Sequence, residues 1–171
     1  MKELKDILFG VSIEQTYGSI DKQTSALAYD SREVVSDALF VAIKGDAVDG
    51  HAYIEVAIKQ GATVVLVEDE GAYDTTEITY VRVNDTRIAL AVMAANYYDH
   101  PSRKLDLIGI TGTNGKTTIA SLCYELFTAM GYAVGLLSTV AVKYGAQVLP
   151  ASHTTPAVSY THLTLPTTPY V

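Results

Sequence analysis

A glycine-bearing turn between a short apolar segment and an amphipathic stretch constrains the fold of this chain more than any other feature. The stretch LIGITGTNGKTTIASL spans residues 107–122, and residues 112–118 within it hold two glycines, one lysine and three threonine hydroxyls. The apolar residues before the turn predict a strand over 105–111, and the helical period after it predicts a helix from about Thr117 to Met130. Such a strand–turn–helix joint is typical of α/β folds.

The helix after the turn has a continuous apolar face, on which residues recur at i, i+3, i+4, i+7, i+8 and i+11. These residues are Ile119, Leu122, Cys123, Leu126, Phe127 and Met130. Gly131 then stands where a helix C-terminus favours positive φ, and the next apolar segment, 132–139, predicts another strand. Strand, helix and strand with short connections form a βαβ unit, so we expect a parallel sheet here.

The first hundred residues also predict alternating strands and helices. Short segments rich in Val and Ile predict strands over 37–45, 63–68 and 79–83. One helix is expected between the first two strands, ending at Gly61, and Asp85 is expected to cap another after the third strand. The residues expected on the packed faces of these helices are Tyr53, Val56, Ala57 and Gln60 in the first, and Ile88, Val92 and Ala95 in the second.

The segment HPSRKL, 100–105, interrupts the periodicity and predicts a domain boundary. We therefore expect an α/β protein with a small N-terminal mixed-sheet α/β domain, 1–100, and the truncated start of a P-loop parallel-sheet domain, 101–156. A parallel sheet needs further βα units to cover both of its faces, so we expect the chain to be the N-terminal part of a longer protein. The Thr- and Pro-rich residues 157–171 follow neither period, and we expect them to be a non-native tail.

The composition of the chain excludes several classes of function. The chain has 171 residues, of which 49% are hydrophobic, so a folded core is expected. Its net charge of −7 argues against a nucleic-acid or anionic-membrane surface. No apolar run is long enough to cross a bilayer and the N-terminus does not read as a secretory signal, so we expect a cytoplasmic protein. We also expect a monomer. A single cysteine, Cys123, excludes an internal disulfide and is expected to be a packed thiol.

The chemistry of the glycine turn points to phosphate binding. The first N–H groups of a helix lack internal partners and lie at the positive end of its dipole, so a curled glycine loop can direct them at an anion. Lys116 could reach the β- and γ-phosphates, and the Thr117 hydroxyl suits Mg²⁺. The strict pattern G-x-x-x-x-G-K-[ST] is incomplete, because Ile110 stands at its first glycine, Gly109 lies one place early and Gly112 gives a shorter turn. An ordinary turn with a solvated lysine is the alternative, but a nucleoside triphosphate site is favoured.

With these residues established, the chain resembles the Mur ligases, ATP-dependent enzymes that lengthen the peptidoglycan stem peptide. Their loop reads T-G-T-N-G-K-T, as in GITGTNGKTT, which also accounts for the missing first glycine. YDSREVVSDALFVAIKGDAVDGHAYI, 29–54, resembles the N-terminal motif shared by the MurE type, which adds the third residue, and the MurF type, which adds the terminal dipeptide. SHTTP, 152–156, resembles a MurE-type segment, and the asparagine-rich stretch typical of the MurF type is not present.

The resemblance implies the substrates and the reaction. A MurE-type ligase binds UDP-MurNAc-L-Ala-D-Glu and joins a diamino acid, meso-diaminopimelate or L-lysine, to the D-glutamate γ-carboxyl. ATP, with Mg²⁺, converts that carboxylate into an acyl phosphate that the amine then attacks. Three alternatives are a MurF-type ligase adding D-Ala-D-Ala, a non-catalytic UDP-sugar-binding fragment, and a generic P-loop ATPase, which would leave the residues before Leu105 unexplained.

The resemblance also assigns roles residue by residue. It implies ATP binding by Gly112, Thr113, Asn114, Gly115, Lys116, Thr117 and Thr118, with Lys116 as the catalytic residue on the β- and γ-phosphates and Thr117 as the Mg²⁺ ligand. It implies that Ser31 contacts the UDP moiety, and that His153, Thr154 and Thr155 contact the muramoyl-peptide end. Asp49, Gly50 and His51 are expected to form a turn and a helix start. The family's carbamylated lysine and third domain cannot be placed, so this polypeptide alone is expected to be nearly inactive.

Overall fold

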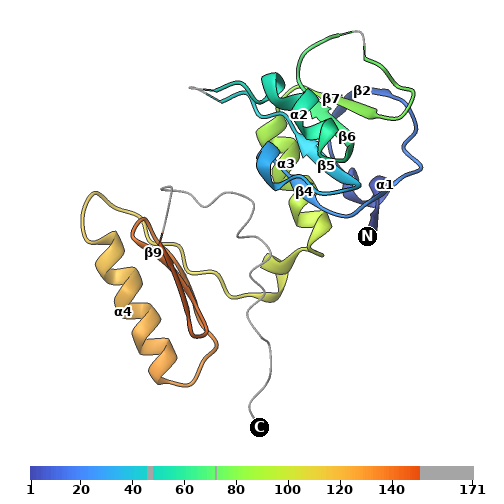
Figure 1. The fold of residues 1–171 in the computed structure, drawn as a ribbon. Coiled ribbons are helices and arrows are strands. Elements are labelled where there is room, and N and C mark those ends of the chain that lie inside the picture. Colours follow the sequence, from blue (N-terminus) through green and yellow to red (C-terminus); the bar gives the residue numbers. More distant parts are fainter. Residues whose placement is uncertain (46–47, 72, 151–171) are drawn as a thin grey trace. The chain divides into compact units, whose positions relative to one another are not determined.

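The computed structural model describes residues 1–45, 48–71 and 73–150 (Figure 1). The chain divides into two compact units, Met1–Asp99 and His100–Val171. Across the described residues, no helix combines the length and apolar character needed to span a membrane.

The first unit is built on a five-stranded mixed sheet. Its elements are β1 (Lys2–Glu3), α1 (Leu4–Ile7), β2 (Ile13–Tyr17), β3 (Gln23–Thr24), β4 (Leu27–Ala28), the 3-10 helix η1 (Ser31–Glu33), β5 (Ala38–Val41), the 3-10 helix η2 (Gly50–Tyr53), α2 (Ile54–Lys59), β6 (Ala62–Val67), β7 (Thr79–Val83) and α3 (Thr86–Tyr97). The strand order is β2-β7-β6-β5-β4, in which β4 to β7 are parallel and β2 runs antiparallel to β7. β1 and β3 form a separate antiparallel pair. The expected mixed-sheet α/β unit is therefore confirmed.

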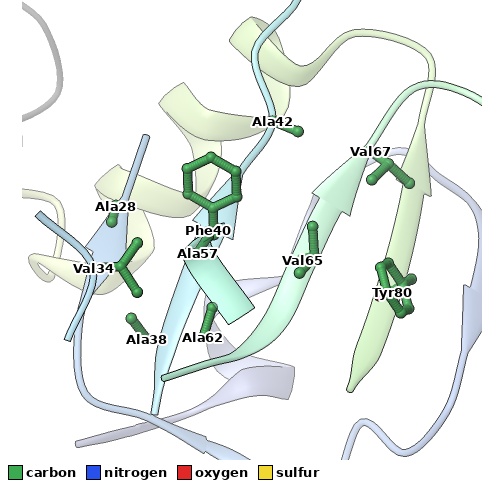
Figure 2. Packing of buried hydrophobic residues seen from close by; sticks show 10 residues of the cluster. All are labelled: Ala28, Val34, Ala38, Phe40, Ala42, Ala57, Ala62, Val65, Val67 and Tyr80. Atoms are coloured by element: carbon green, nitrogen blue, oxygen red, sulfur yellow. The ribbon is translucent and has the colours of Figure 1, made fainter. Parts of the chain in front are cut away.

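The parallel strands are buried on both faces, which explains why they read as nearly continuous apolar runs. On one face Phe40, Val65 and Tyr80 come from three neighbouring strands, and Ala57 of α2 packs over them (Figure 2). Leu39 and Val41 alternate with Phe40 along β5 and are equally inaccessible on the opposite face. The buried apolar residues of α1 and α3, two helices that contact each other, supply the cover that this second face needs.

Two predicted helix faces differ from the structure. In α3 the buried residues are Thr86, Ala89, Leu90, Met93 and Ala94, whereas Ile88 is 66% exposed. In α2 the residues packed on the core are Ile54, Ala57 and Ile58, and Tyr53 and Val56 are exposed. In each segment two different sets of residues satisfy the helical period, and the tertiary contacts decide which set is buried.

The predicted helix ends are confirmed. Asp85 precedes α3, and its Oδ1 accepts hydrogen bonds from the backbone N–H groups of Arg87 (2.8 Å) and Ile88 (2.9 Å). Gly61 follows α2 with φ +112°, a conformation that a side chain would strain. These caps satisfy backbone groups that a helix alone leaves without partners.

The second unit contains the predicted helix after the glycine turn. Its elements are η3 (Pro101–Lys104), α4 (Lys116–Ala129), β8 (Gly135–Leu137), β9 (Ala141–Tyr144) and β10 (Gln147–Pro150). α4 ends at Ala129, and Gly131, two residues later, has a φ of +89°. The N–H groups of Gly131 and Tyr132 donate to the carbonyls of Thr128 and Phe127, each at 3.0 Å, which is the Schellman arrangement. The rings of Phe127 and Tyr132 meet edge to face at 6.0 Å and add the apolar contact that accompanies it.

The sheet of the second unit differs from the expected βαβ arrangement. β8, β9 and β10 form an antiparallel sheet, and in the described part of the chain no strand is assigned over 105–111. Leu107 and Ile108 in that segment are 85% and 59% exposed. A strand exists only where a neighbouring strand takes its backbone hydrogen bonds, and none of the described strands pairs with this segment.

Candidate functional site

The turn before α4 has the backbone shape that the glycines predict. Gly112 has φ +147° and Gly115 has φ +79°, and Gly115 is the residue that precedes the first turn of α4. A Cβ at either position would meet no atom closer than 3.7 Å. Glycine is therefore required here for its left-handed backbone and not for space.

The amides that open α4 are the donors of this site. Ile119 N–H donates to the Gly115 carbonyl at 2.9 Å, which is the first bond of the helical ladder. The amides of Lys116, Thr117 and Thr118 precede that bond and belong to the end of the helix that lacks internal acceptors. Thr117 is half-buried, while Lys116 and Thr118 are exposed. The arrangement offers several N–H groups and the helix dipole to an anion.

Lys116 lies against the same turn. Its Nζ donates to the carbonyl of Gly112 at 2.5 Å and to the carbonyl of Thr113 at 3.2 Å. These bonds hold an ammonium charge beside the amides that open α4. A positive charge beside the N–H groups that open a helix suits the phosphate chain of a nucleotide.

A second candidate region lies in the first unit, at the carboxyl ends of the parallel strands. Ser31 follows β4 and begins η1, where Asp30 acts as the cap. Ser31 is only 9% exposed, so any ligand contact would use the small accessible part of this residue. The carboxyl edge of parallel strands is where open α/β sheets bind ligands.

Asp30 and Arg32 form a local ion pair beside Ser31. Arg32 donates from Nε and from one terminal nitrogen to the Asp30 carboxylate at 2.6–3.1 Å, and the Arg32 amide donates to Asp30 Oδ1 at 2.9 Å. The guanidinium, followed by the backbone N–H, lowers the pKa of Asp30, and the carboxylate raises the pKa of Arg32. The pair shapes the turn that carries Ser31, while the Arg32 side chain stays 86% exposed.

Asp49, Gly50 and His51 form the expected turn and helix start. Asp49 caps η2 by accepting from the His51 amide at 2.9 Å. A Cβ on Gly50 would lie 2.7 Å from the backbone N and O of Ile43, so only glycine fits. His51 also accepts a hydrogen bond from the Glu68 amide, a contact across 17 residues that no local pattern in the sequence indicates.

The remaining predicted residues cannot be placed. His153, Thr154 and Thr155 lie outside the described residues. Ser31 belongs to the first unit and residues 112–118 to the second.

Comparison with known proteins identifies the family to which this chain belongs. Residues 23–98 match the family pattern described as "Mur ligase family, catalytic domain", and residues 110–170 match "Mur ligase middle domain". The chain belongs to the Mur ligase family. The second match begins at the segment that leads into the glycine turn, and the first contains Ser31 and the turn at Gly50.

Three similar curated Mur ligases share one name, UDP-N-acetylmuramoyl-L-alanyl-D-glutamate--2,6-diaminopimelate ligase. The protein of Parabacteroides distasonis is 43% identical over 154 residues, that of Cytophaga hutchinsonii 43% over 155, and that of Bacteroides fragilis 44% over 154. Each alignment covers 90% of this chain and 32% of the relative. The chain thus spans about a third of the length of the curated relatives it matches.

Solved structures agree on the fold. A structure of UDP-N-acetylmuramoyl-L-alanyl-D-glutamate--2,6-diaminopimelate ligase aligns with a TM-score of 0.66 over 96% of this chain and 32% of that chain, at 21% identity. MurF from Acinetobacter baumannii aligns with a TM-score of 0.53 over 75% of this chain and 27% of that chain, at 26% identity.

Proposed function

We propose that this chain is part of a MurE-type ligase that uses ATP to join 2,6-diaminopimelate to UDP-MurNAc-L-Ala-D-Glu. The names of the relatives at 43–44% identity support this substrate pair. The expected domains follow: residues 1–100 would bind the UDP part of the substrate, and residues 101–156 would begin the nucleotide-binding domain. The proposed setting is the cytoplasm, because ATP and a nucleotide-linked sugar are soluble substrates, and the proposed oligomeric state is a monomer.

The glycine turn explains how such a ligase begins its reaction. A carboxylate does not react with an amine until one of its oxygens becomes a good leaving group. Transfer of the γ-phosphoryl group of ATP to the D-glutamate γ-carboxylate gives an acyl phosphate and ADP, and attack by the amine then expels phosphate. This transfer depends on positioning and charge neutralisation more than on a nucleophilic side chain. The amides of Gly115 to Thr118 and the Lys116 ammonium would supply both.

Thr117 fits the proposed metal. It is half-buried in the first turn of α4, next to the proposed phosphate position, and a hydroxyl oxygen is a ligand that Mg²⁺ accepts. Thr117 would hold the ion, which neutralises charge on the phosphate oxygens. Lys116 would then bind the same phosphates from the turn.

The alternative MurF-type function has weaker support. The curated relatives at 40–44% identity are named as diaminopimelate ligases. Among solved structures, identity does not separate the two types, because MurF is 26% identical to this chain and the diaminopimelate ligase 21%. The N-terminal motif is common to both types, so the observation that favours MurE is the relatives' names over 90% of this chain.

The conformation of residues 112–118 carries the proposal, and Lys116→Ala tests it. We expect wild-type chain to bind Mg·ATP in calorimetry and Lys116→Ala to lose this binding, because the phosphate charge loses its cation. Lys104→Ala removes another exposed lysine of the same unit and should keep wild-type affinity. Equal ATP affinity in wild-type chain and Lys116→Ala would contradict the nucleotide site.

Ser31→Ala tests the first unit separately. We expect this variant to bind UDP-MurNAc-L-Ala-D-Glu more weakly while its ATP affinity is unchanged. A parallel loss of both affinities would indicate disrupted folding, and unchanged precursor affinity would remove Ser31 from the proposed site.

A further inference from the structure

The His51 side chain is held by both of its ring nitrogens. Nε2 lies 3.1 Å from the backbone nitrogen of Glu68, and Nδ1 lies 2.7 Å from Oδ1 of Asp49. A backbone N–H can only donate, so Nε2 must accept and carry no proton. Nδ1 therefore holds the ring proton and donates it to Asp49, which fixes one tautomer of a neutral imidazole. The imidazole is only 13% exposed.

His51 joins two connections that follow neighbouring strands. After β5 the chain forms two paired arms, 43–45 and 48–50, through a bridge between Lys44 and Asp49. Gly45 N–H donates to the Val48 carbonyl at 3.0 Å, and Gly50 N–H donates to the Ile43 carbonyl at 2.8 Å. His51 ties these arms to Glu68, the residue after β6.

Glu68 extends the same chain of hydrogen bonds to α3. Its Oε1 accepts from the backbone N–H of Thr86 at 2.8 Å and from the Thr86 hydroxyl at 2.7 Å. Thr86 is fully buried at the start of α3. The arms after β5, the end of β6 and the start of α3 are thus held together at one edge of the sheet.

Ser31 and the paired arms follow neighbouring strands at the same edge of the sheet. β4 and β5 are parallel neighbours in which Ala28 is aligned with Phe40. Ser31 follows the end of β4, and the arm 43–45 follows the end of β5. We propose that His51 is a positioning residue for the UDP part of the substrate, holding the arms 43–45 and 48–50 at the edge that carries Ser31. This inference rests on the proposed UDP site.

Hydrogen bonding accounts for this cluster without a cation. Asp49, His51 and Asp69 offer ligand atoms within 4.8 Å of one another. Both ring nitrogens of His51 already have partners, however, which leaves the imidazole no lone pair for a metal.

The experiment is a titration of the 171-residue chain with UDP-MurNAc-L-Ala-D-Glu at pH 8. We expect the Kd of His51→Ala to exceed that of wild-type chain by about tenfold, the equivalent of one lost hydrogen bond. His51→Gln places an amide oxygen near the position of Nε2, so it should bind nearly as tightly as wild-type chain. His100→Gln, which removes a histidine outside the cluster, should keep the wild-type affinity.

The possible results separate the inference from the proposed function. Tight wild-type binding that is unchanged in His51→Ala would overturn the role of His51 and leave the UDP site standing. Absence of wild-type binding would overturn the proposed function and this inference with it. Nitrogen NMR of the imidazole gives a reading that needs no variant: a proton on Nε2 at pH 8 would also overturn the inference.

Discussion

Gly50→Ala is the substitution whose cost the structure defines most sharply. The new Cβ would lie 2.7 Å from both the backbone nitrogen and the backbone oxygen of Ile43, and 3.0 Å from the carbonyl carbon of Ala42. All three are backbone atoms of the segment that leaves β5, so no side-chain rotation relieves the contact. The paired arms must separate or the end of β5 must move.

The magnitude follows from two contributions. Overpacking of this kind costs about 1–3 kcal/mol, and separation of the arms also loses the 2.8 Å bond from Gly50 N–H to the Ile43 carbonyl, which is worth about 1 kcal/mol. We expect the free energy of unfolding of the first unit to fall by about 2–4 kcal/mol. For a unit of this size the melting temperature should fall by roughly 8–30 °C.

Hydrogen exchange in urea, followed in peptides from β5 and β6, measures this unit alone. Gly109→Ala is the matched control, because a Cβ at Gly109 would meet no atom within 4 Å. It should leave exchange in β5 and β6 at the wild-type rate. A Gly50→Ala chain with wild-type protection in β5 and β6 would refute the reasoning, because it would mean that the arms shift freely.

Three further predictions concern stability. Asp85→Ala should lower the free energy of unfolding by about 1 kcal/mol in urea titrations, while Asp85→Asn should retain most of it, because an amide oxygen can still accept from the first amides of α3. Equal losses in both variants would contradict the capping role. The pKa of Asp30 is lowered in the folded chain by Arg32, so its contribution to stability is complete above the unfolded pKa of about 4 and is lost as the pH falls through the folded value. Asp30→Asn should therefore flatten the loss of urea midpoint below about pH 4, and an unchanged slope would count against the pair. Gly131→Ala should speed hydrogen exchange in the last turn of α4, because φ +89° strains a side chain; unchanged exchange would show that the end of the helix adapts without cost.

Local chemistry in the sequence was enough to predict much of the fold. The strand 79–83 and the cap at Asp85 appear where apolar period and capping chemistry place them. Gly61 and Gly131 end their helices with positive φ, as a residue without a side chain allows. These features depend on neighbours within a few residues, which is the range that a sequence pattern reports.

Features that depend on distant partners were not predictable in the same way. The segment 105–111 has the composition of a strand, but pairing depends on another strand, and none of the described strands supplies it. Ile88 fits a helical stripe as well as Leu90 does, and only the packing of the first unit buries one and exposes the other. The bond between His51 and Glu68 closes 17 residues of chain and leaves no local signature.

The candidate site likewise has features that the sequence could predict and features that it could not. The glycines and Lys116 could be identified from the sequence, because the turn that opens α4 needs positive φ values that glycine adopts without strain. The bonds from Lys116 to the carbonyls of Gly112 and Thr113 could not, since a flexible side chain has several acceptors within reach.

The central claim, that the amides opening α4 and the Lys116 ammonium bind the terminal phosphates of a nucleotide, is tested most directly by amide NMR of the chain titrated with a magnesium complex of a non-hydrolysable ATP analogue. The account predicts saturable shifts that are largest for the amides of Gly115, Lys116, Thr117 and Thr118. Saturable binding with no change at these amides, or no binding at millimolar analogue, would contradict it.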